Sequence, residues 1–173
     1  MIDGHSSFVY KIDNEIDEVV ASTSTGVAGP YGIAINWDET RAFIVAKGEG
    51  AHNKGAVLGV VDLERFRAAR DLRQMPIWLG GSASSVDHAI LRPDPEVNEL
   101  WVSNMIGWET IVLDIETYTA TDWIATAAGG NTHSGAFVSC TSSREGTLEA
   151  DMGGPKSPEM WTAVQAKVAA AAQ

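Results

Sequence analysis

The stretch Thr110-Ile111-Val112-Leu113-Asp114-Ile115-Glu116 joins an apolar, β-branched run to an abrupt polar end. Residues 8–15 and 57–64 have the same design, a β-prone run that ends in Asp-x-Glu. The aspartates of the three copies recur about every 50 residues, so the chain is built from repeats.

Each repeat contains more than this one strand. After Asp-x-Glu comes a second β-prone stretch that runs into glycine, then an apolar run of small and branched residues, and then an aromatic-led strand such as Trp101-Val102-Ser103-Asn104. We name the four predicted strands A to D from the centre of the propeller outwards. The run of small and branched residues is strand A, the aromatic-led strand is B, the strand that ends in Asp-x-Glu is C, and the β-prone stretch after it is D. A period near 50 with four strands is typical of a β-propeller blade.

The predicted fold is therefore all-β, a β-propeller portion made of four-stranded antiparallel blades. Residues 32–79 and 88–126 form two whole blades, while residues 6–25 supply strands C and D of one half blade and residues 134–152 supply strands A and B of another. We expect the propeller repeats to span residues 1–152. Residues 153–173 are expected to form a linker and a short C-terminal helix, because Ser157-Pro158-Glu159 is a helix start before an Ala-rich run.

The repeats resemble a known family. The pattern Gly-Pro-x-Gly-Ile-Ala at 29–34, the strand at 101–104 and the Asp-x-Glu strand ends are similar to YVTN-type repeats. Such repeats build the haem-binding propeller of nitrite reductases, nitrous oxide reductase and the methylamine dehydrogenase heavy chain, and the resemblance covers roughly residues 6–140. It implies a periplasmic or extracellular location, although the start at Met1 shows no basic and apolar regions of a signal peptide.

The blade register predicts an incomplete ring, because a closed propeller has about four to eight blades. One explanation is that the chain is part of a longer propeller. The other is a homo-oligomer closed by strand exchange, in which the half blades of two copies combine into a six-bladed dimer. A partner propeller chain would serve the same purpose.

Composition excludes several classes of partner. The net charge of −11 argues against binding nucleic acid or anionic lipid. No apolar run approaches the roughly 20 residues of a membrane span. The single cysteine, Cys140, excludes an internal disulfide framework and Cys-rich metal sites, and we expect it to be buried.

The histidines carry the functional prediction. His5, His52, His88 and His133 all map to loops or strand entries on one face of the predicted propeller. Neutral imidazole is the commonest metal ligand, so these residues are candidate ligands for a transition metal such as copper, iron or zinc. A small ligand or cofactor could bind at the mouth of the central channel of the predicted propeller. The candidate binding residues there are His88, His133, Lys54 and Tyr31. The alternative is a chance gathering of polar residues in loops.

Asp87 precedes His88, but alternation along a strand points neighbouring side chains to opposite sides, which predicts a solvated carboxylate. Common catalytic motifs do not occur, so catalytic residues and enzyme activity stay unassigned. The leading prediction is a partial propeller whose histidine-bearing face binds a small ligand or metal. The alternatives are a non-catalytic protein-interaction module and a truncated fragment of a redox propeller enzyme.

Overall fold

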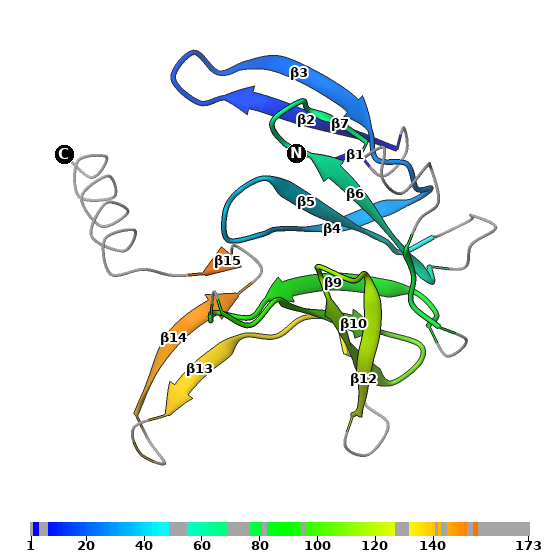
Figure 1. Ribbon diagram of the computed structural model, residues 1–173, viewed down its shortest axis with the longest axis vertical. Helices are drawn as coiled ribbons and strands as arrows, with labels where there is room; N and C mark the ends of the chain where they lie inside the picture. The colour runs from blue at the N-terminus through cyan, green and yellow to red at the C-terminus, as the bar shows by residue number, and fades with distance from the viewer. Residues whose placement is uncertain are drawn as a thin grey trace.

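The computed structural model describes residues 2–3, 7–48, 55–68, 77–80, 83–94, 96–126, 132–140, 142, 145–151 and 154–155. All regular elements within these residues are β-strands, arranged in four antiparallel sheets that follow one another along the chain (Figure 1). Among the described residues, no helix is long and apolar enough to cross a membrane.

Two sheets correspond to the predicted whole blades. The second sheet consists of β4 (Pro30–Ile35), β5 (Arg41–Ala46), β6 (Val57–Asp62) and β7 (Arg67–Ala68), and β8 (Ile77–Trp78) also pairs with β6. The third consists of β9 (Val86–Leu91), β10 (Glu99–Asn104), β11 (Glu109–Asp114) and β12 (Thr119–Ala125). The outermost position of the second sheet is thus shared by two short strands, whereas β12 fills that position alone in the third.

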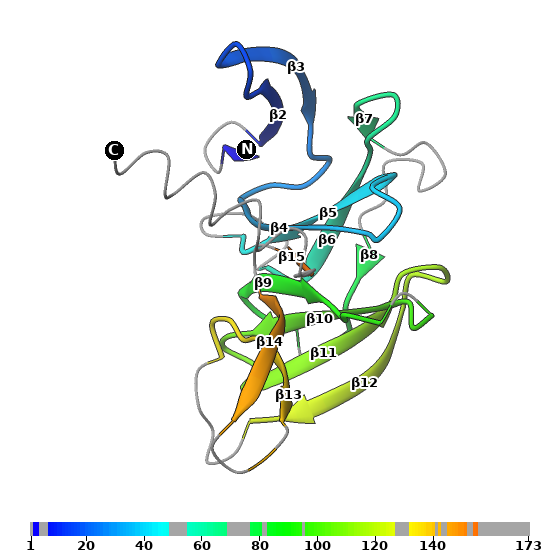
Figure 2. The same ribbon diagram turned by 90° about the vertical axis from the view of Figure 1, so that its left-hand side faces the viewer.

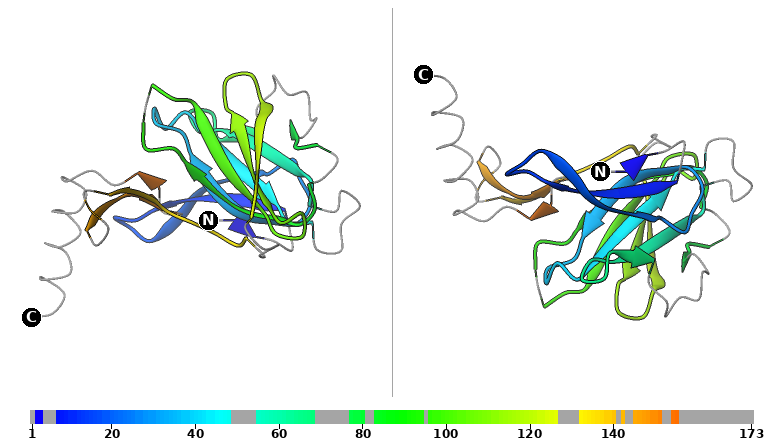
Figure 3. Two further views of the ribbon diagram at one scale, coloured as in Figure 1. Left: turned by 90° about the horizontal axis from the view of Figure 1, so that it is seen from below. Right: turned by 90° about the horizontal axis from the view of Figure 1, so that it is seen from above.

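The remaining two sheets correspond to the predicted half blades. The first contains β1 (Ile2–Asp3), β2 (Phe8–Asp13) and β3 (Glu18–Ser24), and the last contains β13 (Phe137–Cys140), β14 (Gly146–Asp151) and β15 (Gly154–Pro155). Each therefore has one two-residue strand beyond the two that the sequence predicts. In Figure 3, β14 lies to one side of the sheets formed by β4 to β12. The predicted C-terminal helix lies outside the described residues.

The Asp-x-Glu motifs form the hairpin turns between the two outer strands. The Asp13 carboxylate accepts a hydrogen bond from the Glu15 amide at 2.9 Å, and the Asp114 carboxylate accepts from the amides of Glu116 and Thr117 at 2.9 and 2.7 Å. Aspartate thereby replaces a backbone acceptor and fixes the turn. The repeat that decides the fold is a repeat of this turn.

The core lies between the sheets. Alternate residues of β5 face opposite ways: Ile44 packs in the cluster that includes Val9 of the first sheet, and Phe43 packs in the cluster that includes Leu100 of the third. All of these side chains except Val9 are fully buried, and Val9 is 2% exposed. A sheet covered on both faces by neighbouring sheets is the packing expected of blades in a propeller. The all-β, propeller-like fold is confirmed.

The innermost strands of the second and third sheets run side by side. Figures 1 and 2 both show β4 directly next to β9. At Gly32 the two backbones come so close that an added β-carbon would lie 2.6 Å from the carbonyl oxygen of Asp87. Only glycine permits this approach, and it brings the start of β4 against the residues of β9 that form the candidate site.

Candidate functional site

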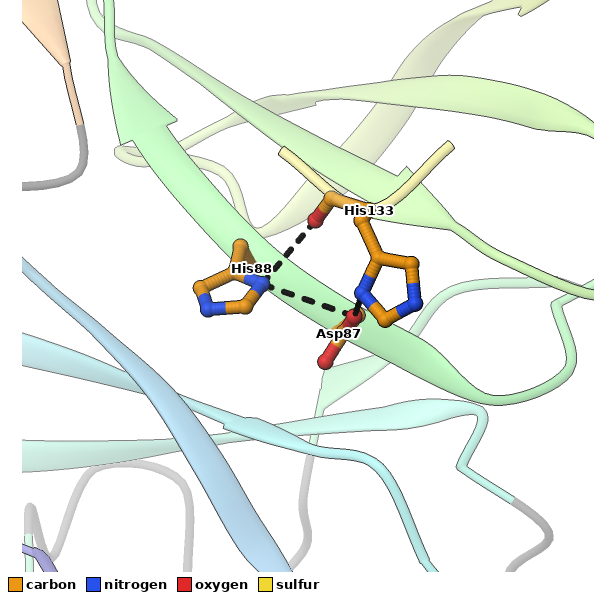
Figure 4. Close-up of side chains that lie close together, drawn as sticks. All are labelled: Asp87, His88 and His133. Carbon is orange, nitrogen blue, oxygen red and sulfur yellow. Dashed lines mark hydrogen bonds and ion pairs between the residues drawn. The ribbon is translucent and has the colours of Figure 1, made fainter. Parts of the chain in front are cut away.

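The site begins with an irregularity in the third sheet. Val102 of β10 pairs with Ala89 and Asn104 pairs with Val86, so Asp87 and His88 together oppose the single residue Ser103. This is a β-bulge, which bends the strand and redirects side chains that strict alternation would separate. The bulge brings Asp87 and His88 into one cluster with His133, which precedes β13 (Figure 4).

Asp87 is the centre of the cluster. Its side chain has no solvent exposure, which corrects the predicted solvated carboxylate. The physical reason is the bulge, because it turns the carboxylate inward instead of to the side opposite His88. Both carboxylate oxygens lie close to basic groups, but neither accepts a well-formed hydrogen bond from the described part of the chain.

The two imidazoles approach Asp87 from different elements. His133 Nδ1 contacts Asp87 Oδ2 directly, and His88 Nδ1 lies 3.5 Å from the same oxygen. The side chains of His88 and His133 are 24% and 54% exposed, so solvent reaches the imidazoles but not the carboxylate. The cluster is a buried carboxyl group with two accessible imidazoles on its outer side.

Ser103 holds this arrangement together. The His88 amide donates to its hydroxyl oxygen at 2.9 Å, and the hydroxyl donates to the His133 carbonyl oxygen at 2.8 Å. His88 Nδ1 also lies 2.9 Å from that carbonyl. Because a carbonyl only accepts, the His88 ring carries its proton on Nδ1 when this bond is made. The segment before β13 is therefore tied to the bulge of β9.

The second sheet adds a cation and an aromatic ring. Lys47 Nζ lies 3.8 Å from Asp87 Oδ1 and 4.2 Å from the centre of the Tyr31 ring, and its side chain is only 10% exposed. The Tyr31 ring meets the His88 ring edge-on at 5.2 Å between centres. Lys47 follows β5 directly, and Tyr31 lies in β4, so the close packing of β4 on β9 delivers both.

Of the sequence-predicted residues, the structure brings together His88, His133 and Tyr31. His5, His52 and Lys54 lie outside the described residues. Cys140 is exposed at the end of β13, contrary to the predicted burial, because this end of the strand is uncovered: Val138 and Ser139 beside it are exposed as well. Lys47 and the role of Ser103 were not predicted from the sequence. The signal that the sequence offered was their position, with Lys47 directly after β5 and Ser103 at the end of β10.

The three side chains offer a mixed nitrogen and oxygen ligand set. One ligand atom each from Asp87, His88 and His133 can be chosen such that all lie within 4.8 Å of one another. Two imidazoles with one carboxylate suit zinc, copper or iron, and leave coordination positions open to an external ligand. The residues present therefore fit a transition-metal ion.

The fold relates the chain to several solved structures. Kuenenia stuttgartiensis hydrazine synthase matches at a TM-score of 0.57 and 15% identity, over 80% of this chain and 35% of that one. Apo AztD from Citrobacter koseri matches at 0.53 and 10%, over 73% and 32%. The dihydro-heme d1 dehydrogenase NirN in complex with DHE matches at 0.52 and 12%, over 86% and 29%.

These neighbours are propeller-type proteins. No family model matches the sequence, and neither does any curated protein. At these identities the likeness concerns the fold, not the activity. The chain spans about a third of the length of each neighbour and shares with them a β-propeller-like fold.

Proposed function

We propose that this propeller portion binds a transition-metal ion through Asp87 and His88, near the start of β9, and His133, before β13. The observation that supports the proposal is the Asp87 carboxylate, which is fully buried while neither oxygen accepts a hydrogen bond within the described residues. A buried carboxylate needs compensating positive charge, and beside Lys47 and the two imidazoles a bound cation would supply it directly.

The metal would supply Lewis acidity and open coordination positions for a small external ligand. The residues of the chain have separate tasks. Asp87 supplies charge from the buried side, and the imidazoles supply nitrogen from the solvent side. A nitrogen ligand must be deprotonated, so ligation through His88 Nδ1 would release its hydrogen bond to the His133 carbonyl. Ser103 would then remain to hold that carbonyl in place.

Lys47 sets the charge balance of the site. Its ammonium group lies 3.8 Å from Asp87 Oδ1 and adds a positive charge beside the proposed cation. Like charges repel, so Lys47 lowers the affinity of the site for a metal cation. We expect Lys47→Met to bind zinc more tightly than the parent protein, measured by competition with a chromophoric chelator.

The direct test is metal content. The purified chain is loaded separately with Zn²⁺, Cu²⁺ and Fe²⁺, desalted, and measured by elemental analysis. We expect one ion per chain in the parent protein and loss of that ion in the His88→Ala, His133→Ala double variant and in Asp87→Asn. Glu116→Gln, which removes an exposed carboxylate in a distant turn, is the matched control. Equal metal content in all variants would contradict the proposal.

His5 and His52 extend the test to the wider histidine prediction. The repeat register predicts that they lie on the same propeller face as His88 and His133. If they add ligands to the centre, His5→Ala and His52→Ala each lower zinc affinity measurably. Unchanged affinity would restrict the site to the three residues of the cluster.

A second proposal concerns ring closure. Large apolar side chains are exposed on the first sheet, among them Ile12 at 39%, Val19 at 59% and Val20 at 49%, and Val138 of the last sheet is 53% exposed. Exposed apolar sheet faces of this kind favour covering by another blade. We propose YVTN-type blades completed by a second copy of the chain, as a six-bladed dimer, or by further propeller blades, in a periplasmic or extracellular setting.

This closure is measured by light scattering at micromolar concentration with a parallel thermal melt. A dimer mass that falls to the monomer mass in Val19→Asp, Val138→Asp supports strand exchange between copies. A monomer that melts cooperatively would contradict it and favour the alternative of a stand-alone interaction module.

A further inference from the structure

A pocket of about 330 Å³ lies beside the cluster of Asp87, His88 and His133, between strands β9 and β10 and the segment 132–138. His88 belongs to both places, since its Nδ1 faces Asp87 and its ring lines the pocket. Ligand pockets commonly measure about 300 to 1,000 Å³, so this one is at the small end of the range. It suits a molecule of one or two rings.

The wall of the pocket is apolar and aromatic. Trp101 and Phe137 meet edge-to-face with ring centres 5.1 Å apart, and Ile90 and Val138 extend the apolar surface. The Trp101 ring is held in place, because its Nε1 donates to Glu99 Oε2 at 3.1 Å and Arg92 donates to the same oxygen at 2.8 Å. A fixed aromatic wall favours a flat ring that packs against it.

The remaining surface is polar but uncharged. Besides His88, the polar residues that line the pocket are Ser103, Thr110, Thr132 and Ser134, each of which carries a hydroxyl group. The Ser103 hydroxyl donates to the His133 carbonyl, and the Thr132 hydroxyl is 2.7 Å from that of Thr126. Among the described residues that line the pocket there is no lysine, arginine, aspartate or glutamate. An ionic ligand would therefore lose its hydration without gaining a counter-charge.

We propose that this pocket binds a small uncharged aromatic molecule, with its polar end at His88 and the hydroxyl groups of Thr110 and Ser134. The inference rests on the proposed function in one respect, namely that this molecule is the external ligand whose polar end reaches the metal centre. The aromatic wall, the volume and the lack of charged residues in the described part of the lining are independent of the metal.

Gly135 provides a selective way to close the pocket. It lines the cavity, and a β-carbon added there would meet only Ile90 Cδ1, at an ordinary contact distance of 3.7 Å. Gly135→Val therefore fills pocket volume with little strain on the backbone. Ser134→Leu is a second closing variant in case the first fails to fold. Ile106→Ala, which removes an exposed apolar side chain that does not line the pocket, from the turn between β10 and β11, controls for nonspecific adsorption of aromatic compounds.

The experiment compares benzamide with benzoate, which has nearly the same shape but a negative charge. Binding to the metal-stripped chain is measured by calorimetry or ligand-observed NMR, with folding of each variant checked by thermal melting. We expect benzamide to bind the parent protein, benzoate to bind about tenfold more weakly or worse, and the folded closing variant to lose about tenfold or more in benzamide affinity. Ile106→Ala is expected to bind like the parent.

Three outcomes would overturn the proposal: no benzamide binding by the folded parent, equal binding of benzoate, or unchanged benzamide affinity in a folded closing variant. The same titration with zinc-loaded protein tests the link to the metal. If the ligand reaches the centre, zinc changes benzamide affinity and benzamide changes zinc affinity by the same factor. Pocket binding that persists without metal, together with a failed metal test, would refute the proposed centre while leaving the pocket proposal intact.

Discussion

The inner strands β4 and β9 occupy the same place in neighbouring sheets but carry different chemistry. Each has a register irregularity near its start, with Tyr31 at the shift in β4 and Asp87 with His88 at the shift in β9. In β4 the residues are an aromatic ring and Gly32, which allow close packing. In β9 they are a carboxylate and an imidazole. The repeat supplies the geometry, and the residues that depart from it supply the site.

The two strands also depend on each other. Gly32 admits the backbone of Asp87, and Tyr31 packs between Lys47 and His88. The second sheet therefore contributes to a candidate site whose proposed ligands come from the third sheet and from the segment before β13. Substitutions in one strand should therefore have measurable effects at the other.

The largest expected effect comes from Gly32→Val. The new side chain would clash with the Asp87 carbonyl, which lies 2.6 Å from the position of an added β-carbon. We expect a loss of about 3 kcal/mol or more in the free energy of unfolding, measured by urea denaturation. Gly135→Val, the same chemical change at an open position, is the control and should lose much less. Equal losses would contradict the close packing of β4 on β9.

Asp87→Asn should have the next largest effect, on the metal rather than on the fold. The change keeps the shape of the side chain but removes its charge. We expect zinc affinity to fall about a hundredfold or more. This loss is larger than the loss expected from substituting a residue that only hydrogen-bonds to a metal ligand. Competition with a chelator measures it. An unchanged affinity would exclude Asp87 as a ligand.

Ser103→Ala tests the coupling between the bulge and the segment before β13. It removes the hydroxyl that accepts from the His88 amide and donates to the His133 carbonyl. We expect zinc affinity to fall about tenfold, because the imidazoles lose orientation. Ser103→Thr retains the hydroxyl and should recover most of the loss, whereas a purely steric role would leave both variants alike.

Asp114→Ala tests the repeated turn away from the site. The Asp114 carboxylate accepts from the amides of Glu116 and Thr117, so its removal should cost about 1 kcal/mol of stability. Denaturation by urea measures the loss, and metal affinity should not change. A loss of metal affinity here would contradict the separation of the outer turns from the inner site.

The smallest expected effect is the pH dependence of stability. Hydrogen bonds from the Thr117 and Glu116 amides lower the pKa of Asp114, and the hydrogen bond from Arg92 lowers the pKa of Glu99. A carboxyl group whose pKa is lower in the folded state stabilises the fold at pH values above its unfolded pKa. This stabilisation is lost as the pH falls through the folded pKa. We therefore expect the melting temperature to decrease slightly once the pH is lowered past about 4.5, and to decrease less in Asp114→Ala. A melting temperature that rises on acidification would contradict this.

The sequence predicted the repeat well because the Asp-x-Glu turn depends on local chemistry. Asp13 and Asp114 fix their turns with their own neighbours, and the period of these turns predicts the blades. The site was less accessible. His88 and His133 could be predicted from the positions where strands enter, but Asp87 was misread because alternation does not reveal a bulge.

Other parts of the site depend on contacts between distant segments. Lys47 reaches Asp87 because β4 and β5 pack against β9, and the contact of Phe137 with Trp101 joins two distant segments in the pocket wall. Cys140 shows the reverse case, in which an apolar residue at a strand end stays exposed. Such contacts between sheets are not encoded in the spacing of any single repeat.

Whether the bulge in β9 and the segment before β13 form a metal centre can be measured by X-ray absorption at the metal edge of zinc-loaded protein. We expect the scattering signature of two imidazoles and an oxygen ligand at about 2.0 to 2.2 Å, with loss of one imidazole in His133→Ala. A spectrum without imidazole scattering, or one unchanged in His133→Ala, would contradict it.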